Sequence, residues 1–271
     1  MSLVETNWLE KNLNNVKIID CSWHMPLTRG NGLEEYKKQH IPNSIFFDLD
    51  ENSKKDTKLP HMLVQEEDWN NIVSKMGINN TDKIVIYDNS DVISSCRLWF
   101  NLIYFGHNAK LVHVLNGGFQ KWLSENKRVT DQVSCTDNSN YKSLEKKELV
   151  KDKIMIDKNL DVQDFKLIDA RSKDRFHGKI PEPREGLRSG SIRNSFCIPF
   201  NTCLNEDRTF KKKSELEKIF KECLKDLNEK NIVFSCGSGV TACVLALAYS
   251  LINDKYLPCI YDGSWAEYGM I

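Results

Sequence analysis

The sequence has no excess of charge of either sign, because 38 Lys and Arg residues balance 38 Asp and Glu residues. Nucleic acids and anionic membranes attract proteins through clustered positive charge, so we expect neither as a partner. The longest uncharged apolar run, from Val240 to Ile252, is shorter than the roughly 20 residues that a membrane-spanning helix needs. A small-molecule substrate or a protein partner is the better expectation.

The N-terminal stretch MSLVETNWLEKNLNN lacks both the basic head and apolar core of a secretory signal and the Arg-rich character of a transit peptide. We therefore expect a cytoplasmic protein, with mitochondrial import through an unrecognised signal as the alternative. The nine cysteines form no CxxC pair, and no histidine cluster has zinc spacing. The sequence thus favours a reducing compartment and predicts neither a metal nor an organic cofactor.

The chain contains two copies of one pattern, which is typical of a tandem duplication. Each copy reads as a strand ending in an acidic residue, a turn into a second strand, a strand followed by a long helix, and a late glycine-containing block. The matched blocks, first copy before second, are VKIIDCSW and FKLIDARS, HIPNSIFFDLD and SIRNSFCIPF, DKIVIYDNSDVISSCRLWFNLIYFG and KNIVFSCGSGVTACVLALAYSLI, and VLNGGFQKW and IYDGSWAEY.

Short apolar strands alternate with segments of helical period in each copy, which predicts an α/β fold with a mostly parallel sheet flanked by helices. We expect an N-terminal domain over residues 1–135, a charged linker over 136–153 and a C-terminal domain over 154–271. The linker could instead be a long surface excursion of the first domain. Asn43 and Asn194, in the turns of the second block, are expected to adopt the left-handed conformation.

The second copy has a cysteine, Cys236, where the first has Asp88. In open α/β sheets, ligands bind at the carboxyl ends of strands, where loops lead into helices. The strand IVFS would place Cys236 at this edge, and Gly237 and Gly239 would allow a tight curve with backbone N–H groups directed at the sulfur. We expect a reactive thiolate, with the chemistry confined to the second domain.

The loop has other possible interpretations besides a nucleophilic role for Cys236. Cys236 could be an inert core thiol, or the chain could be a non-catalytic interaction module. GSGVTA also satisfies the dinucleotide pattern G-x-G-x-x-A, with Asp262 as the acidic residue, although little chain follows for the rest of such a domain. A cysteine phosphatase would need an arginine at the far end of the loop, where Ala242 stands.

Together with the duplication, the loop CGSGVTA and the near-terminal YDGSWAEY resemble the active-site loop and C-terminal signature of the rhodanese superfamily, in particular its mercaptopyruvate-using sulfurtransferases. LPHML and RFHGKIPEPREG are further similar blocks, so the resemblance spans nearly the whole chain. Members that use thiosulfate have basic residues after the cysteine, where this chain has Gly237 and Ser238. The resemblance therefore implies 3-mercaptopyruvate as substrate, with thiosulfate as the alternative.

The resemblance implies that Cys236 carries the transferred sulfur as a persulfide. Arg175 and Arg184 match the family's substrate-binding arginines, and a guanidinium group can bind both oxygens of a carboxylate. Surface salt bridges are the competing role for these arginines. The other loop residues that we predict to bind substrate are Gly237, Gly239, Val240 and Thr241.

Ser238, His61 and Asp50 match a set of family residues in which Asp50 would orient His61 and His61 would work with Ser238 to move a proton. A helix cap for Ser238, a loop histidine and a structural carboxylate are the competing roles. Thioredoxin is the family's usual sulfur acceptor, with small thiols or cyanide as substitutes and hydrogen sulfide as a product. Because the acceptor attacks the outer sulfur, we expect Cys236 to be open to solvent.

Overall fold

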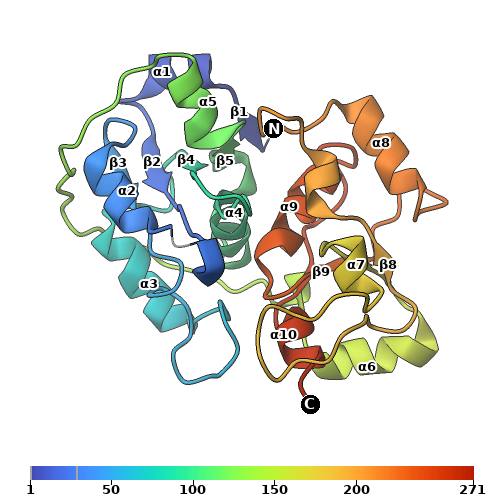
Figure 1. Cartoon of the computed structure of the whole chain (residues 1–271). Coiled ribbons are helices and arrows are strands. Elements are labelled where there is room, and N and C mark those ends of the chain that lie inside the picture. The colour runs from blue at the N-terminus through green and yellow to red at the C-terminus, as the bar shows by residue number, and fades with distance from the viewer. Residues whose placement is uncertain (1, 29) are drawn as a thin grey trace. The chain divides into compact units, whose positions relative to one another are not determined.

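The computed structural model describes residues 2–28 and 30–271, and these form two compact units (Figure 1). Unit 1 comprises the chain up to Lys54 together with Leu63–Lys146 and Glu206–Thr209. Unit 2 comprises Lys55–Met62, Lys147–Asn205 and Phe210–Ile271. Each repeat therefore contributes one short segment to the unit that is built mainly from the other repeat.

Unit 1 is a five-stranded parallel sheet with strand order β1-β5-β4-β2-β3. Its strands are β1 (Leu3–Val4), β2 (Lys17–Asp20), β3 (Ser44–Phe46), β4 (Ile84–Tyr87) and β5 (Val112–Leu115). Its helices are α1 (Thr6–Asn12), η1 (Pro26–Thr28), α2 (Gly32–Lys38), α3 (Glu66–Lys75), α4 (Ser95–Tyr104), η2 (Ala109–Leu111) and α5 (Gly118–Ser124).

The central strands of unit 1 are buried because helices cover both faces of the sheet. β4 and β5 are buried along their whole length, as expected for the middle of a parallel sheet. On the face of the sheet that α1 and α5 cover (Figure 1), Leu9 of α1 and Trp122 of α5 pack with Val85 and Tyr87 of β4. Because neighbouring strand residues point to opposite faces, Ile84 and Ile86 face the other side.

Unit 2 repeats this sheet, with strand order β6-β10-β9-β7-β8 and all pairs parallel. Its strands are β6 (Val150–Lys151), β7 (Lys166–Asp169), β8 (Phe196–Cys197), β9 (Ile232–Ser235) and β10 (Ile260–Tyr261). Its helices are η3 (Lys147–Leu149), α6 (Lys153–Val162), α7 (Lys173–Phe176), η4 (Phe200–Cys203), α8 (Lys213–Lys221), α9 (Val240–Ser250) and α10 (Ser264–Tyr268).

The core of unit 2 also has two sides. Ile156 of α6 and Trp265 of α10 pack with Val233 of β9 on one face. On the other, the rings of Phe220 in α8 and Phe234 in β9 meet edge to face, with centroids 6.2 Å apart. The uncharged helix α9 is buried from Val240 to Tyr249 except at Thr241, which explains why its sequence has no polar face.

The predicted duplication and α/β class are confirmed, because the two sheets share one strand order. The left-handed conformation predicted for Asn43 and Asn194 is also confirmed, with φ of 66° and 64°. A second matched pair of left-handed residues is His61, with φ of 60°, and Arg208, with φ of 66°. These two lie in the segments contributed by each repeat to the other unit.

The stretch predicted as a linker, residues 136–153, includes η3 and β6, and β6 pairs with β10. All nine cysteines are free thiols. Across residues 2–28 and 30–271, no helix combines the length and the apolar composition that crossing a membrane requires.

Candidate active site

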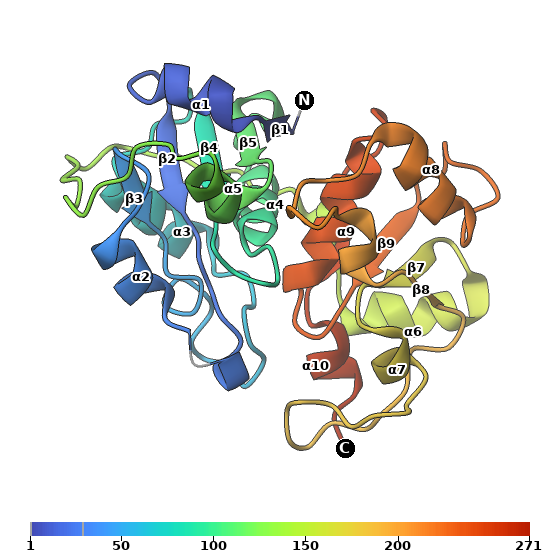
Figure 2. The same cartoon turned by 45° about the horizontal axis from the view of Figure 1, so that its top comes forward.

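The predicted cysteine loop lies between β9 and α9. β9 ends at Ser235, Cys236 follows directly, and α9 begins at Val240 (Figure 2). Gly239 is the N-cap of α9 and has φ of 77°, a conformation that side chains disfavour. The loop therefore turns the chain at Gly239, at the carboxyl edge of the sheet, as the sequence predicts.

The start of α10 holds this loop in place. The Cys236 amide donates to Ser264 Oγ at 3.1 Å. The Trp265 and Ala266 amides donate to the carbonyl oxygens of Cys236, at 2.9 Å, and Gly237, at 2.8 Å. The signature block near the C-terminus is thus the support of the cysteine loop.

Cys236 itself is buried, with 2 % relative exposure, whereas the sequence analysis predicts an open sulfur. The physical reason lies in the support just described, because the start of α10 packs on the backbone of Cys236 and Gly237. The neighbouring Gly237 is partly exposed. The residue next to Cys236 is therefore the more exposed of the two.

Gly237 leaves room for neighbouring side chains, whereas its φ lies outside the left-handed region and does not call for a glycine. A β-carbon at this position would lie 3.2 Å from Arg175 Nη2 and 3.7 Å from Arg184 Nη1. Both predicted arginines thus bring guanidinium nitrogens to the residue next to Cys236. Arg175 and Arg184 thus lie close to the loop, and their binding of substrate stays a prediction.

Glu182 positions Arg175 in this arrangement. Its carboxylate accepts hydrogen bonds from Arg175 Nε at 3.2 Å and Nη2 at 2.5 Å. It also accepts one from Arg171 Nη1 at 2.7 Å, and its side chain is only 1 % exposed. The sequence has no signal for this role, although Glu182 lies in the same block, PEPREG, as Arg184.

Arg171 is the buried member of this network. Its guanidinium group forms a two-pronged ion pair with Asp169 at the end of β7 and lies 4.4 Å from the centroid of the Trp265 ring. Burial disfavours its charge, but the Asp169 and Glu182 carboxylates outweigh that cost and raise the pKa of Arg171 above its ordinary value. A continuous chain of ion pairs therefore links Asp169 at the end of β7, through Arg171 and Glu182, to Arg175.

His61 and Ser238 are in contact within unit 2. His61 Nδ1 and Ser238 Oγ share a hydrogen bond of 3.0 Å, and the two residues are 4 % and 6 % exposed. Ser238 lies two residues after Cys236, so this hydrogen bond joins His61 to the cysteine loop. His61 reaches it because Lys55–Met62, a segment of the first repeat, belongs to unit 2.

Asp50 belongs to unit 1, where its carboxylate accepts a hydrogen bond from Trp23 Nε1 at 2.8 Å. Its orienting role toward His61 stays a prediction. Val240 is buried and Thr241 partly exposed in the first turn of α9, immediately after the loop. Their contact with substrate also stays a prediction.

Comparison with known families decides the classification. The model of the rhodanese-like domain matches residues 5–125 and again residues 152–270. The chain belongs to the rhodanese family. The two matches together cover most of the sequence and correspond to its two repeats.

Named relatives extend the similarity over the whole chain. It is 37% identical over 290 residues to the Arabidopsis thaliana protein "Thiosulfate/3-mercaptopyruvate sulfurtransferase 1, mitochondrial", covering 98% of this chain and 75% of the relative. It is 34% identical over 277 residues to the Mus musculus 3-mercaptopyruvate sulfurtransferase, covering 99% and 92%. The Escherichia coli SseA crystal structure, titled as a 3-mercaptopyruvate sulfotransferase, matches with TM-score 0.87 and 28% identity over 98% of this chain and 99% of SseA. Sulfur transfer is the activity that these rhodanese relatives support.

The rhodanese domain of the first repeat has a different loop at the matching place. Asp88 follows β4 as Cys236 follows β9, and its carboxylate accepts hydrogen bonds from the Ser90 and Ser95 amides at 2.9 and 3.0 Å. Arg208 donates to the Ser90 carbonyl oxygen and lies 4.0 Å from the Asp88 carboxylate. A carboxylate and its counter-ion therefore stand where unit 2 has its thiol.

Proposed function

We propose that this rhodanese-family protein transfers the sulfur of 3-mercaptopyruvate, through a persulfide on Cys236, to a thiol acceptor and releases pyruvate. The observation that carries the proposal is the approach of Arg175 and Arg184 to Gly237, the neighbour of Cys236. A ketoacid carries a carboxylate and a carbonyl oxygen, which match guanidinium donors. The mouse and Arabidopsis relatives, both named for 3-mercaptopyruvate, support the same substrate.

The chemistry follows from the loop. The Cys236 thiolate attacks the sulfur of 3-mercaptopyruvate and forms an S–S bond, while the C–S bond breaks and its electron pair becomes the enolate of pyruvate. The two arginines hold the carboxylate and the developing negative charge of this leaving group. A proton on the enolate carbon then completes pyruvate.

His61 and Ser238 are the proposed source of that proton. Their hydrogen bond of 3.0 Å allows a proton to pass between the imidazole and the hydroxyl group. In the proposal Asp50 orients His61 and keeps its ring in one tautomer. Gly237, Gly239, Val240 and Thr241 shape the backbone around the transferred sulfur.

Thiosulfate is the second candidate donor, because the Arabidopsis relative is named for both substrates. Thiosulfate is a compact dianion that basic side chains in the loop would favour, and Gly237-Ser238-Gly239 has none. The lack of charge in this loop favours the ketoacid.

The second half of the reaction needs an acceptor. We propose a thioredoxin-like dithiol or a small thiol, whose thiolate attacks the outer sulfur of the persulfide. Because Cys236 is buried, the proposal requires the loop region to open before an acceptor as large as thioredoxin can react. We also propose a reducing compartment, the cytoplasm or the mitochondrial matrix, consistent with nine free thiols.

Intact-mass measurement after mixing with 3-mercaptopyruvate tests the proposal. We expect one added sulfur, about 32 Da, on the wild type and none on Cys236→Ser. Cys243→Ser is the matched control, because Cys243 is a fully buried thiol of α9 and should leave the mass shift unchanged. Sulfur carried by Cys236→Ser would overturn the assignment, and cyanide-dependent turnover that strongly prefers thiosulfate would overturn the choice of donor.

A further inference from the structure

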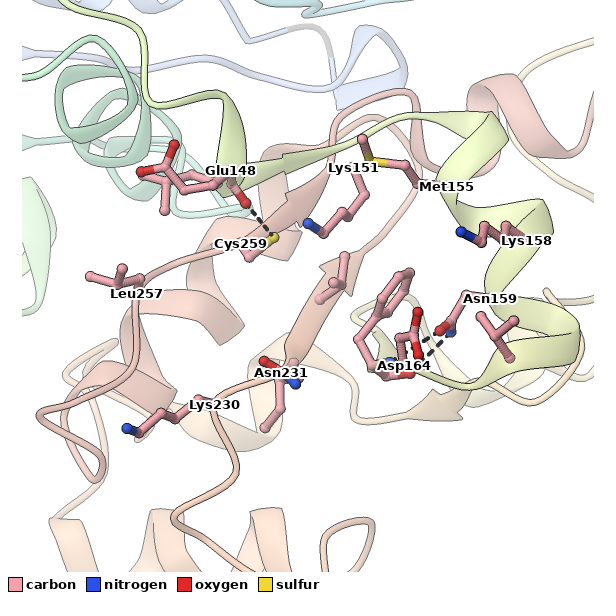
Figure 3. A pocket seen from close by; sticks show the side chains of 15 residues that line it. Glu148, Lys151, Met155, Lys158, Asn159, Asp164, Lys230, Asn231, Leu257 and Cys259 are labelled. Carbon is pink, nitrogen blue, oxygen red and sulfur yellow. Dashed lines mark hydrogen bonds between the residues drawn. The ribbon is translucent and has the colours of Figure 1, made fainter.

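Unit 2 has a cavity of about 400 Å³ away from the cysteine loop (Figure 3). It lies at the amino ends of the strands, where Val150 begins β6 and Asn231 and Cys259 precede β9 and β10. The cysteine loop lies at the opposite, carboxyl ends. The cavity is therefore separate from the proposed active site, and its volume falls in the range of small-molecule sites.

Apolar side chains line this cavity and remain exposed there. Met155, Val162 and Leu257 are 46%, 49% and 63% exposed, which is high for residues of this kind. The buried residues Ile232 and Val233 also line the cavity, and we call these two residues its apolar floor. Apolar groups gathered at one concave site, instead of scattered singly, favour a ligand with an apolar body.

Positive charge surrounds the apolar floor. Lys151, Lys158 and Lys230 line the cavity, and in the part of the chain that the structure describes none of the three forms an ion pair. Figure 3 shows the Lys151 ammonium group pointing toward Cys259. Burial raises the pKa of Cys259 to about 11, so its thiol is neutral at pH 7 and does not balance these lysines.

The cavity also has carboxylates on its lining, Glu148 and Asp164. The Cys259 thiol donates to the backbone carbonyl oxygen of Glu148 at 3.6 Å, so this contact does not use the Glu148 carboxylate. Three ammonium groups against two carboxylates leave the lining with an excess of positive charge. A ligand with an acidic group fits this balance better than a cationic or neutral one.

Unit 1 shows what fills the equivalent place. β1 and β5 pair through Leu3 and Val114 as β6 and β10 pair through Val150 and Ile260, so the repeats superpose at this edge. The third residue of α1 is Trp8, and the third residue of α6 is Met155. An indole ring in unit 1 thus corresponds to an exposed, flexible side chain in unit 2.

The contacts of Trp8 describe a binding site for a flat ring. Its ring lies 6.4 Å from that of His113, the residue before Val114, whereas Cys259 precedes Ile260 in unit 2. The Lys83 ammonium group lies 5.5 Å from the centroid of the indole ring, a cation–π contact. In unit 2 both rings are replaced by smaller side chains, and Asn231 stands in the place of Lys83.

We propose that the cavity in unit 2 binds an aromatic organic anion, whose ring takes the place that the Trp8 indole has in unit 1 and whose acidic group is attracted by the positive charge of Lys151, Lys158 and Lys230. This site is independent of the proposed sulfur transfer. It would couple the protein to a small metabolite at the edge of the sheet opposite Cys236.

Calorimetric titration of the full chain with 2-naphthalenesulfonate tests the proposal, with 2-naphthylmethylammonium as a ligand of similar shape and opposite charge. For a ligand of this size we expect a Kd of about 1 mM or tighter for the sulfonate. The ammonium compound should bind at least about tenfold more weakly. Equal binding of the two, or no sulfonate binding up to about 5 mM, would overturn the proposal.

Variants locate the site. Met155→Trp places in α6 the side chain that fills the equivalent space in unit 1, so sulfonate binding should weaken at least about tenfold. Ile154→Trp is the matched control, because Ile154 precedes Met155, is 79% exposed and does not line the cavity. Unchanged affinity in Met155→Trp would show that the sulfonate binds elsewhere.

If Met155→Trp lowers the melting temperature, a variant that removes positive charge tests whether the sulfonate binds in the cavity. The double variant Lys151→Gln with Lys230→Gln should weaken sulfonate binding about tenfold while leaving the apolar floor intact. Lys153→Gln is its control, since Lys153 pairs with Asp157 and lies outside the lining. Equal losses in the double variant and this control would also overturn the proposal.

Discussion

The Glu182 carboxylate holds the Arg175 guanidinium group by two hydrogen bonds, from Nε at 3.2 Å and from Nη2 at 2.5 Å. A guanidinium group held at two points has few orientations left, so the donors of Arg175 that Glu182 does not use are directed before any substrate arrives. Pre-organisation of this kind lowers the entropy lost on binding. The same carboxylate also binds the buried Arg171, which ties the direction of Arg175 to the core of unit 2.

Glu182→Gln should therefore weaken substrate binding more than it slows the chemical step. We expect KM for 3-mercaptopyruvate to rise about tenfold with kcat reduced less than about threefold, because an amide holds Arg175 by one neutral contact. The free energy of unfolding should fall by about 2 kcal/mol, since Arg171 loses a charged partner in the interior. Steady-state kinetics and urea unfolding measure the two effects. Glu185→Gln, at an exposed position of the same block, is the control, and an equal rise of KM there would contradict the role of Glu182.

Two glycines of one loop should respond differently to alanine. In Gly237→Ala the new β-carbon would lie 3.2 Å from Arg175 Nη2, so we expect a rise of KM of about fivefold and a loss of stability below about 1 kcal/mol. In Gly239→Ala the backbone φ of 77° disfavours any side chain, so we expect a loss of about 1 to 2 kcal/mol. Thermal unfolding and kinetics on both variants distinguish a steric contact with Arg175 from backbone strain at residue 239. Identical behaviour of the pair would contradict the distinction.

His61→Asn should slow the transfer from 3-mercaptopyruvate by about a hundredfold in kcat, because asparagine tolerates the left-handed φ of 60° but moves no proton. Turnover of thiosulfate, where no carbon needs a proton, should change much less. Comparing the two donors in one preparation therefore isolates proton transfer from loss of structure. His24→Asn is the control for the removal of an imidazole elsewhere, and a matching loss with both donors would argue that His61 is structural.

Stability should depend on pH through Asp20. Burial raises the pKa of this carboxyl to about 6 from an ordinary value of 3.8, and the charge of Asp88 adds to the effect, although hydrogen bonds from Ser22 oppose it. The folded protein thus binds this proton more tightly than the unfolded chain. The contribution of Asp20 to the free energy of unfolding is therefore fully present below pH 4 and is lost as the pH rises through about 6. Asp20→Asn should gain roughly 2 kcal/mol relative to wild type at pH 7 and little at pH 4, measured by urea unfolding at both values. An equal effect at both pH values would contradict the shift.

Much of this arrangement can be predicted from the sequence, because it depends on patterns along the chain. Alternation of strands and helices implies the parallel sheets, and the alignment of the repeats places Cys236 at the end of β9 opposite Asp88 at the end of β4. The left-handed turns at Asn43 and Asn194 follow from the tolerance of asparagine for that conformation.

The parts that escaped prediction depend on contacts between distant segments. Nothing in the spacing of PEPREG indicates that Glu182 is buried between two arginines, since a carboxylate is more often exposed. The sequence favours backbone curvature as the role of Gly237, whereas in the structure the lack of a side chain there leaves room for Arg175. Burial of Cys236 results from the packing of α10, which lies nearly thirty residues further on and has no local signal at the thiol.

Each repeat contributes a segment to the other unit, Lys55–Met62 to unit 2 and Glu206–Thr209 to unit 1. This exchange limits how the protein can be divided into separate domains. A gene fragment that starts at residue 147 would encode the sheet, the thiol and both arginines of unit 2, yet it would lack the imidazole that meets Ser238. The other fragment would have Asp88 without the cation supplied by Arg208. Neither half is a self-sufficient building block, so shortening this chain to a single-domain enzyme would require grafting an eight-residue loop as well as deleting a domain.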